Sequence, residues 1–435
     1  MTERPKLVKI GRMMTTTPSS KPSGLPLREL LDPTHPLVKL TQALDWEAFT
    51  QAFGPLYAEA GRGSVPVRVM VGLHYLKHTF NESDESVVAK WVENPYWQYF
   101  CGGETFQHEL PCHPTSLVKW RQRIGTTGIE TLLKNILQAA LKVQALPRAD
   151  LKQVTVDTTV QEKAIAFPTD ARLYHKARRT LVRVAKANGL KLRQTYARVS
   201  PRLLQQQSRY AAARQMKRAA RQTRKLRTLL GRVIRDVERK CPQPPEALQT
   251  VLERARRIHT QQRDTSPKLY SVHAPEVECL AKGKAHKRYE FGCKVAVSST
   301  TRSNWLVGIQ AHHANPYDGA TLKPALVQIH HLTGVAPEQA LVDQGFRGQE
   351  HHPAGVTVVI TRFTAKVSAA VKQLFKRRNA IEPIIGHAKS DHGLARNYLR
   401  GTHGDLINAL LVGCGFNIAK LLHFFAHAQP AWICA

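Results

Sequence analysis

Three acidic residues stand where a carboxylate is unusual unless it is used. Asp157 interrupts the apolar pattern VTVDTTV, Asp343 follows the run ALV, and Glu382 lies in the basic stretch RRNAIEPIIGHAK. Carboxylates that meet at one point repel one another unless a cation neutralises them. Oxygen ligands favour Mg²⁺ or Mn²⁺, and two such ions about 3.5–4 Å apart can activate a nucleophile and stabilise a leaving oxygen. Together the three acids predict metal-dependent phosphodiester chemistry.

Each acid also has a purely structural interpretation. Asp157 could face solvent, and Asp343 could begin the turn DQGFRG, a common role for Asp before Gly. Glu382 could form an exposed i,i+4 pair with Arg378, worth only about 0.3–0.5 kcal/mol. Because Pro383 disfavours helical geometry in the residue before it, a helix could start or kink here. Asp318, in NPYDGATL, is the best rival of Asp343, although a turn role is favoured for it.

The charge of the chain indicates a polyanionic partner. Its 435 residues include 64 Lys and Arg against 32 Asp and Glu, a net charge of +32. Such an excess opposes compaction by self-repulsion, and nucleic acid is the natural partner because no lipid-binding signal accompanies it. Residues 171–240 hold 22 Lys and Arg and only two acids. We interpret this segment as a DNA-binding arm, the alternative being the solvated face of a structural helix pair.

The elements that must position the acids alternate in type along the chain. Residues 36–145 show helical periodicity, and a strand with Asp157 near its middle follows. A hairpin is predicted over 289–313 with its turn at Thr300 to Asn304, GVTVVITR predicts a short buried strand, and helices resume from 365. We therefore expect an α/β core with a mixed sheet, interrupted by a basic helical insertion and preceded by an all-α domain. The expected division is a flexible tail 1–25, a helical domain 26–148, an α/β domain 149–170 plus 269–428 that holds the three acids, and an insertion 171–268.

Localisation signals favour the cytoplasm. The N-terminus lacks the apolar run of about 7–15 residues that a signal peptide needs. The stretch LINALLVGCGFNIAKLLHFF is interrupted by Asn408, Asn417 and Lys420, so a buried helix is favoured over a membrane span. Seven scattered cysteines without a CxxC motif fit a reduced, intracellular protein. We expect a cytoplasmic protein, associated with the bacterial nucleoid, that makes no membrane contact.

The acids and their surroundings resemble the DDE transposases of bacterial insertion sequences, in the family named after insertion sequence 5 and its relatives. Arg378, Glu382 and Lys389 match the R-(3)-E-(6)-K part of that family's signature. The blocks VDTTVQ, VDQGFRG, HPTSLVKWRQRIG and FNESDESVV are also similar, and the likeness covers residues 27 to 425 in order. Phe375 replaces the signature's Tyr, so a hydroxyl is missing there. Pro383 stands where some relatives carry a basic residue.

The resemblance implies an RNase H-like catalytic core in which Asp157, Asp343 and Glu382 hold two Mg²⁺ (or Mn²⁺) ions. Metal-activated water would cut double-stranded DNA at the terminal inverted repeats, and the freed 3′-hydroxyl would attack target DNA. The helical domain 26–148 would recognise the DNA ends, and residues 149–170 plus 269–428 would form the catalytic domain. Because two ends must be paired, a homodimer on DNA is expected. The DNA-contacting candidates are Arg347, Arg377, Arg378, Lys389 and Arg400.

Two other functions remain open at this stage. One is a different RNase H-like metal nuclease, which would cut DNA without joining it. The other is a catalytically dead DNA-binding derivative, which would bind ends without metal-dependent turnover. The presence of all three acids disfavours the second.

Overall fold

The computed structural model describes residues 25–57, 63–281, 288–361 and 368–427. The predicted tail lies outside these residues except for its last residue, Leu25. The chain divides into two compact units, residues 1–161 with 294–435 and residues 162–293. Both boundaries fall inside β-strands, whereas the sequence placed the ends of the insertion at 170/171 and 268/269. Each unit is described by itself below.

The first unit begins with helices, as the periodicity of residues 36–145 predicts. In α7, Gly125 adopts φ 61°, a left-handed backbone conformation that breaks the helix into two segments. Ser83 caps α5 through a reciprocal capping box with Ser86. These helices are α1 (Leu27–Leu30), α2 (Pro36–Ala43), α3 (Trp46–Phe53), η1 (Gly54–Leu56), α4 (Val67–Thr79), α5 (Asp84–Glu93), α6 (Pro95–Phe100), α7 (Pro114–Lys142) and η2 (Arg148–Lys152).

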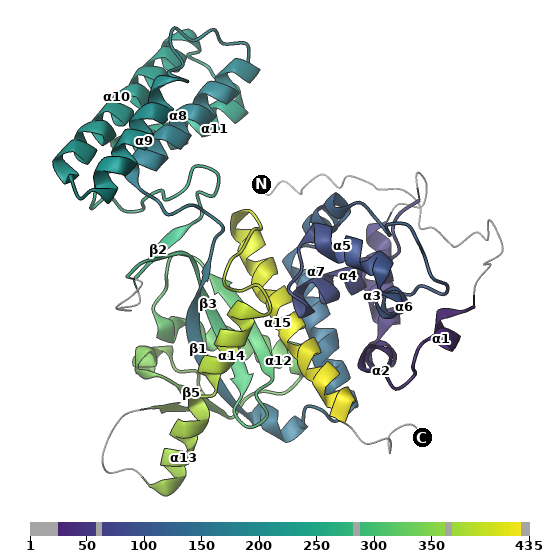
Figure 1. Ribbon diagram of the computed structural model, residues 1–435. Helices are drawn as coiled ribbons and strands as arrows, with labels where there is room; N and C mark the ends of the chain where they lie inside the picture. The colour runs from purple at the N-terminus through teal and green to yellow at the C-terminus, as the bar shows by residue number, and fades with distance from the viewer. Residues whose placement is uncertain (1–24, 58–62, 282–287, 362–367, 428–435) are drawn as a thin grey trace. The chain divides into compact units, whose positions relative to one another are not determined.

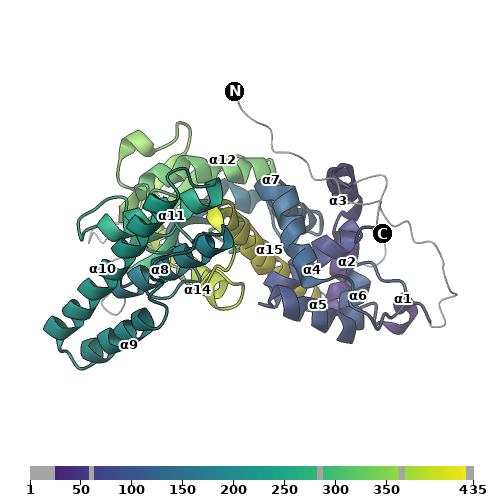
Figure 2. The same cartoon turned by 90° about the horizontal axis from the view of Figure 1, so that it is seen from above.

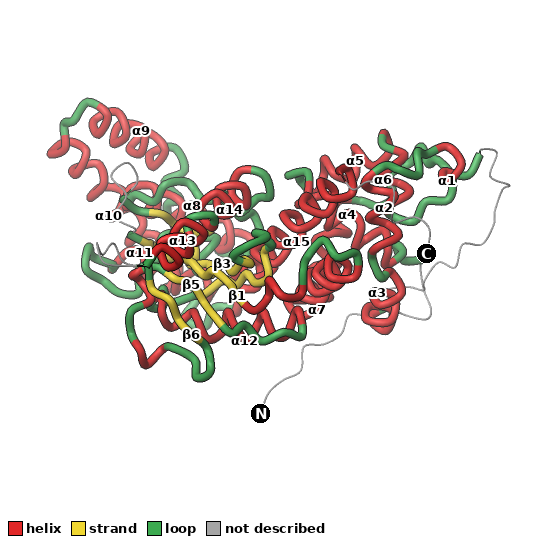
Figure 3. The backbone as a smooth tube through the Cα atoms, turned by 90° about the horizontal axis from the view of Figure 1, so that it is seen from below, coloured by secondary structure: helices red, strands yellow, loops and turns green. Residues whose placement is uncertain are grey.

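A mixed sheet follows, with the strand order β2-β3-β1-β5-β6 and β4 paired to β3. The β3–β4 hairpin is antiparallel, and β1–β5 and β5–β6 are parallel. Figure 3 shows β1, β5 and β6 side by side. The predicted hairpin over 289–313 and the mixed sheet are confirmed. The strands are β1 (Gln153–Glu162), β2 (Glu278–Leu280), β3 (Glu290–Thr300), β4 (Leu306–His312), β5 (Gln339–Val342) and β6 (Thr357–Ile360).

One strand differs from its prediction. Residues 357–360 form β6, but none of its side chains is buried. It is the last strand in the sheet order and pairs with β5 alone. An apolar run can therefore mark an edge strand as well as a central one.

The remaining helices of the first unit cover the sheet. Figures 1 and 2 show α15 running between the N-terminal helices and the strands, and it contacts α4, α7 and β4. A Cβ on Gly415 would lie 2.4 Å from the carbonyl oxygen of His78, so glycine permits the close approach of α4. These elements are η3 (Asp318–Thr321), α12 (Leu322–Thr333), η4 (Gln344–Phe346), η5 (Gln349–His351), α13 (Ala369–Arg378), α14 (Ile381–Ser390) and α15 (Gly401–His427).

Helix α15 contains the apolar stretch predicted to be a buried helix. In the described part of the chain it alone is long and apolar enough to cross a membrane by length and composition. Two thirds of its most apolar window is buried inside the structure, including Leu411, Val412 and Ile418. Such burial is typical of the core helix of a globular unit.

The second unit is a bundle of four helices joined to β2 and the start of β3 (Figure 1). Leu181, Leu230, Val233 and Leu252 are among the side chains of its core. The basic segment 171–240 therefore forms three helices rather than the helix pair considered from the sequence, and a fourth helix completes the bundle. The helices are α8 (Asp170–Ala187), α9 (Val199–Ala212), α10 (Met216–Lys240) and α11 (Glu246–Thr260).

Candidate active site

The parallel pairing of β1 and β5 places two of the candidate acids next to each other. Gln153 pairs with Gln339 and Thr155 with Leu341, and extending this register by two residues brings Asp157 opposite Asp343. Asp343 directly follows β5, where ligands of α/β sheets commonly bind. Its side chain accepts a hydrogen bond of 2.8 Å from the Gly345 N–H, which fixes the carboxylate at the start of η4.

The third acid, Glu382, lies near the junction of two helices. Helix α13 ends at Arg378 and α14 begins at Ile381, so the chain breaks where Pro383 had suggested a start or a kink. Pro383 is the third residue of α14, where a helix does not need its backbone N–H as a donor. Glu382 lies in this first turn with 69 % of its side chain exposed.

Arg378 joins the three acids. Its Nη2 lies 2.7 Å from Asp157 Oδ2 and 3.8 Å from Asp343 Oδ2, and its Nη1 lies 3.5 Å from Glu382 Oε1. The guanidinium is buried, and its Nε has no hydrogen-bond partner among the residues that the structure describes. The i,i+4 pair considered at the outset does form, but it is one contact of a cluster that draws its acids from a strand, a strand end and a helix start.

Among the described residues, this cluster brings together more acidic than basic groups. Three carboxylates share one guanidinium, although the whole chain carries +32. Their side-chain exposure rises from 15 % for Asp157 to 39 % for Asp343 and 69 % for Glu382. The oxygen-only donor set and the surplus negative charge fit the ligands that Mg²⁺ and Mn²⁺ prefer.

The other residues predicted to contact DNA differ in their exposure. Lys389 is half-buried two turns after Glu382, about 10 Å along α14. Arg377, Arg347 and Arg400 are exposed, and Arg347 donates to Gln344. Phe375, which takes the place of the signature's Tyr, is half-buried in α13.

A fourth carboxylate, Asp318, borders the site; the sequence argument named it as the best rival of Asp343 but favoured a turn role for it. Its Oδ1 accepts hydrogen bonds from Thr158 Oγ1 at 3.0 Å and from Lys294 Nζ at 2.7 Å. A Cβ on Gly345 would lie 2.9 Å from both Asp318 Oδ2 and Asp343 Oδ1, so these two carboxylates flank the same glycine. The available signal was Lys294 itself, a lysine inside the buried strand pattern FGCKVAV, since a buried lysine needs a partner.

Contacts with α4 hold the C-terminal end of α14. His78 and His392 each place Nδ1 against the other's carbonyl oxygen, at 3.2 and 2.9 Å. Asn81 Nδ2 donates to Ser390 O at 3.1 Å. The helix that carries Glu382 is therefore fixed to the N-terminal helices.

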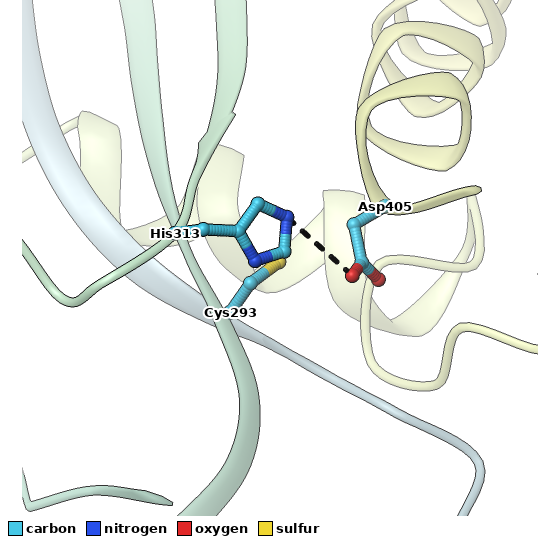
Figure 4. Close-up of side chains that lie close together, drawn as sticks. All are labelled: Cys293, His313 and Asp405. Atoms are coloured by element: carbon cyan, nitrogen blue, oxygen red, sulfur yellow. Dashed lines mark ion pairs between the residues drawn. The ribbon is translucent and has the colours of Figure 1, made fainter. Parts of the chain in front are cut away.

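A buried polar network secures the start of α15 (Figure 4). His313 Nε2 lies 3.7 Å from the Asp405 carboxylate, which also accepts a hydrogen bond from Asn397. Gln161, at the end of β1, donates to the Asp405 carbonyl and accepts from Asn408. These contacts tie the strand that carries Asp157 to the core helix.

Comparison with known proteins shows the family of the chain and one of its domains. The chain is 49 % identical over 206 residues to "Uncharacterized protein ORF8 in nfe locus" of Rhizobium meliloti, a match covering 47 % of this chain and all of that protein. The chain belongs to the family of that protein. Residues 25–123 match the family model described as "Transposase domain (DUF772)", so this family member carries a transposase domain. No solved structure matches the chain.

The transposase domain corresponds to the N-terminal helices of the first unit. It extends from α1 into α7 and ends two residues before the break at Gly125. His78 and Asn81, which contact α14, both lie within it. The matched domain is thus in direct contact with the helix that carries Glu382, while the acids themselves lie outside the matched residues.

Proposed function

We propose that this protein is a DDE transposase with an RNase H-like core. In this proposal it binds the terminal inverted repeats of an insertion sequence as a homodimer on DNA, cuts the ends and joins the freed 3′-hydroxyl to target DNA. It acts in the cytoplasm, on the nucleoid. The observation that carries the proposal is the convergence of Asp157, Asp343 and Glu382 on Arg378. A solvated surface pair would need only two of these groups.

The residues have distinct roles in the proposed chemistry. Asp157, Asp343 and Glu382 would hold two Mg²⁺ or Mn²⁺ ions, which supply activation of the attacking oxygen and stabilisation of the leaving oxygen. Asp157 is fixed within a strand and Asp343 by the Gly345 N–H, so both are preorganised. Glu382 is the most exposed of the three and is the one best placed to adjust when DNA arrives. Arg378 holds the acids together and offers positive charge beside the scissile phosphate.

The test is a plasmid reaction. Purified protein is incubated with Mg²⁺ and a supercoiled plasmid that carries the gene with its native flanking DNA, and strand breaks are mapped. Glu382→Gln is the test variant. Asp391→Asn is the matched control, because it neutralises an exposed acid just after the same helix, whose carboxylate pairs with His387.

We expect breaks and joined products at the element's ends, lost in Glu382→Gln and retained in Asp391→Asn. Breaks without joining would replace the proposal with a metal nuclease. Binding without breaks in any of the proteins would leave a DNA-binding derivative and sink the catalytic role.

A further inference from the structure

The solvent-facing side of helix α10 is almost entirely basic. Leu226, Leu230, Val233 and Val237 face the bundle core. The opposite side, here called the α10 outer face, spans an arc of about 120° and runs for about 33 Å at 1.5 Å per residue. That length is close to one turn of duplex DNA. Beside the exposed Thr228, the exposed residues of the α10 outer face are all basic: Lys217, Arg218, Arg221, Arg224, Lys225, Arg232, Arg235 and Arg239.

At its C-terminal end the α10 outer face borders a cleft of about 500 Å³. Four arginines line it, Arg193, Arg232, Arg235 and Arg239, against the single carboxylate of Asp236. We call it the arginine cleft. A concave surface with this charge suits an anion of phosphate size, because Arg presents several N–H donors in a fixed planar arrangement.

The arginine cleft is preformed. Asp236 Oδ2 accepts the Arg193 backbone N–H at 2.7 Å, and buried Arg178 donates to the Thr195 carbonyl. Lys240 donates to the carbonyl of Lys191. These three contacts fix the segment between α8 and α9 against α8 and α10, so the wall of the cleft exists before any ligand binds.

The cleft carboxylate is already neutralised. Asp236 is buried and pairs with Arg239 and with Lys240, the latter at 3.6 Å. Within the described part of this unit, Arg193, Arg232 and Arg235 make no ion pair with a carboxylate. Three guanidinium groups therefore remain available for an external anion.

We propose that the second unit binds the phosphate backbone of duplex DNA along the α10 outer face, with the arginine cleft holding phosphate at one end. DNA as the partner follows from the proposed function, whereas the phosphate chemistry follows from the cleft alone. A duplex is favoured over a single strand because Tyr196 is the one aromatic residue that lines the cleft. The backbone contacts give affinity without reading sequence.

The experiment measures DNA affinity of the full chain without cleavage. A fluorescein-labelled duplex of roughly one to three helical turns is titrated in EDTA over a series of salt concentrations, and binding is followed by anisotropy. The test variant is Arg232→Gln with Arg235→Gln. The matched control is Arg179→Gln with Arg183→Gln, which removes the same charge from exposed positions of α8 in the same bundle.

We expect the cleft pair of substitutions to weaken binding about tenfold and to lower the slope of log affinity against log salt by about 1.8, or 0.9 for each lost phosphate contact. The control pair changes the slope by less than half as much. Arg232→Lys with Arg235→Lys retains the slope, because charge is kept. Inorganic phosphate at millimolar concentration competes weakly, since the duplex engages the whole face.

Equal losses in the cleft and control variants would overturn the proposal, because they would reflect total charge alone. Unchanged affinity in the cleft variant would overturn it as well. If the double glutamine variant fails to fold, Arg235→Gln alone is expected to lower the slope by about 0.9, and an unchanged slope there would overturn the proposal. Cleft-dependent binding together with an inert plasmid reaction would sink the catalytic proposal and leave this one standing.

Discussion

The two units of this protein use charge in opposite ways. In the first unit, charged groups are buried and joined in networks, as in Arg121, whose guanidinium donates twice to Asp84, and in Arg378 with its three acids. In the helix bundle of the second unit, by contrast, cations line exposed helix faces, and the described ion pairs of its acids lie on or between these helices. The buried pair of Lys163 and Glu276 in this unit lies outside the four helices. Buried charge fixes geometry at a cost in desolvation, whereas exposed charge contributes little stability and can serve a polyanionic partner. The charges of the first region fix the positions of side chains, whereas the exposed cations of the second can attract an anion.

The largest expected effects concern two acids of the same cluster. We expect Asp157→Asn and Glu382→Gln each to lower DNA cleavage by at least about 10³-fold, or about 4 kcal/mol. Only Asp157→Asn should also destabilise the fold, by about 3 kcal/mol, because it leaves the buried Arg378 without its closest partner. Glu382 is exposed, so its substitution should cost less than about 0.5 kcal/mol.

Denaturant unfolding of both variants in EDTA, beside cleavage assays in Mg²⁺, checks this pair. Equal stability losses would show that Arg378 does not depend on Asp157. Full cleavage by either variant would remove that acid from the proposed chemistry.

A second contrast concerns the ion pair of Lys294 and Asp318. Lys294 is buried, whereas the side chain of Asp318 is 28 % exposed and is also held by Thr158. Asp318→Asn leaves a buried ammonium without a counter-ion and should cost about 3 kcal/mol. Lys294→Met removes the buried charge itself and should cost only about 1 kcal/mol.

Chemical denaturation of the two variants measures both losses of stability, with Glu350→Gln as an exposed acid control in the same unit. A larger loss of stability in Lys294→Met than in Asp318→Asn would contradict the prediction. It would mean that the main role of Asp318 is not to offset the cost of burying the Lys294 charge.

Patterns between residues that are close in the sequence predicted most of the helices and strands. Period-two alternation indicated β1, the turn at Thr300 to Asn304 indicated the β3–β4 hairpin, and Pro383 indicated a start or kink where α14 begins, because these signals depend on neighbours in the chain. The sequence could not show that Arg378 contacts all three acids, since that requires the register of β1 against β5. Asp318 was undervalued for the same reason. Its partners Thr158 and Lys294 are distant in sequence, so the turn motif NPYDG was the only local clue.

The pH dependence of stability depends on how completely the first unit buries its histidines. Burial lowers the pKa of His74 to about 3, and it also lowers the pKa of His78 and of His392. These imidazoles are neutral in the folded protein but take up protons in the unfolded chain below about pH 6.5. Stability is therefore fully present above that pH and falls as the pH is lowered, by about 1.4 kcal/mol for each fully buried imidazole between pH 7.5 and 5.5.

Free energies of unfolding at these two pH values measure the effect. A His74→Gln variant should lose about 1.4 kcal/mol of the pH dependence. If its pH dependence equals that of the parent protein, His74 does not stay neutral in the folded unit.

The smallest expected effect lies in the second unit. Arg232→Gln with Arg235→Gln should change the free energy of unfolding by less than about 0.5 kcal/mol, because both side chains are exposed and lack carboxylate partners in the described part of the bundle. Thermal melting followed by circular dichroism gives the value, beside the same pair of substitutions at Arg179 and Arg183. A loss of several kcal/mol would make these arginines part of the folding framework, as Arg121 is in the first unit. A stable variant that has lost DNA affinity would show that the charge of these two arginines acts on an external partner and not on the fold. That outcome would distinguish this helix bundle from the acid cluster of the first unit.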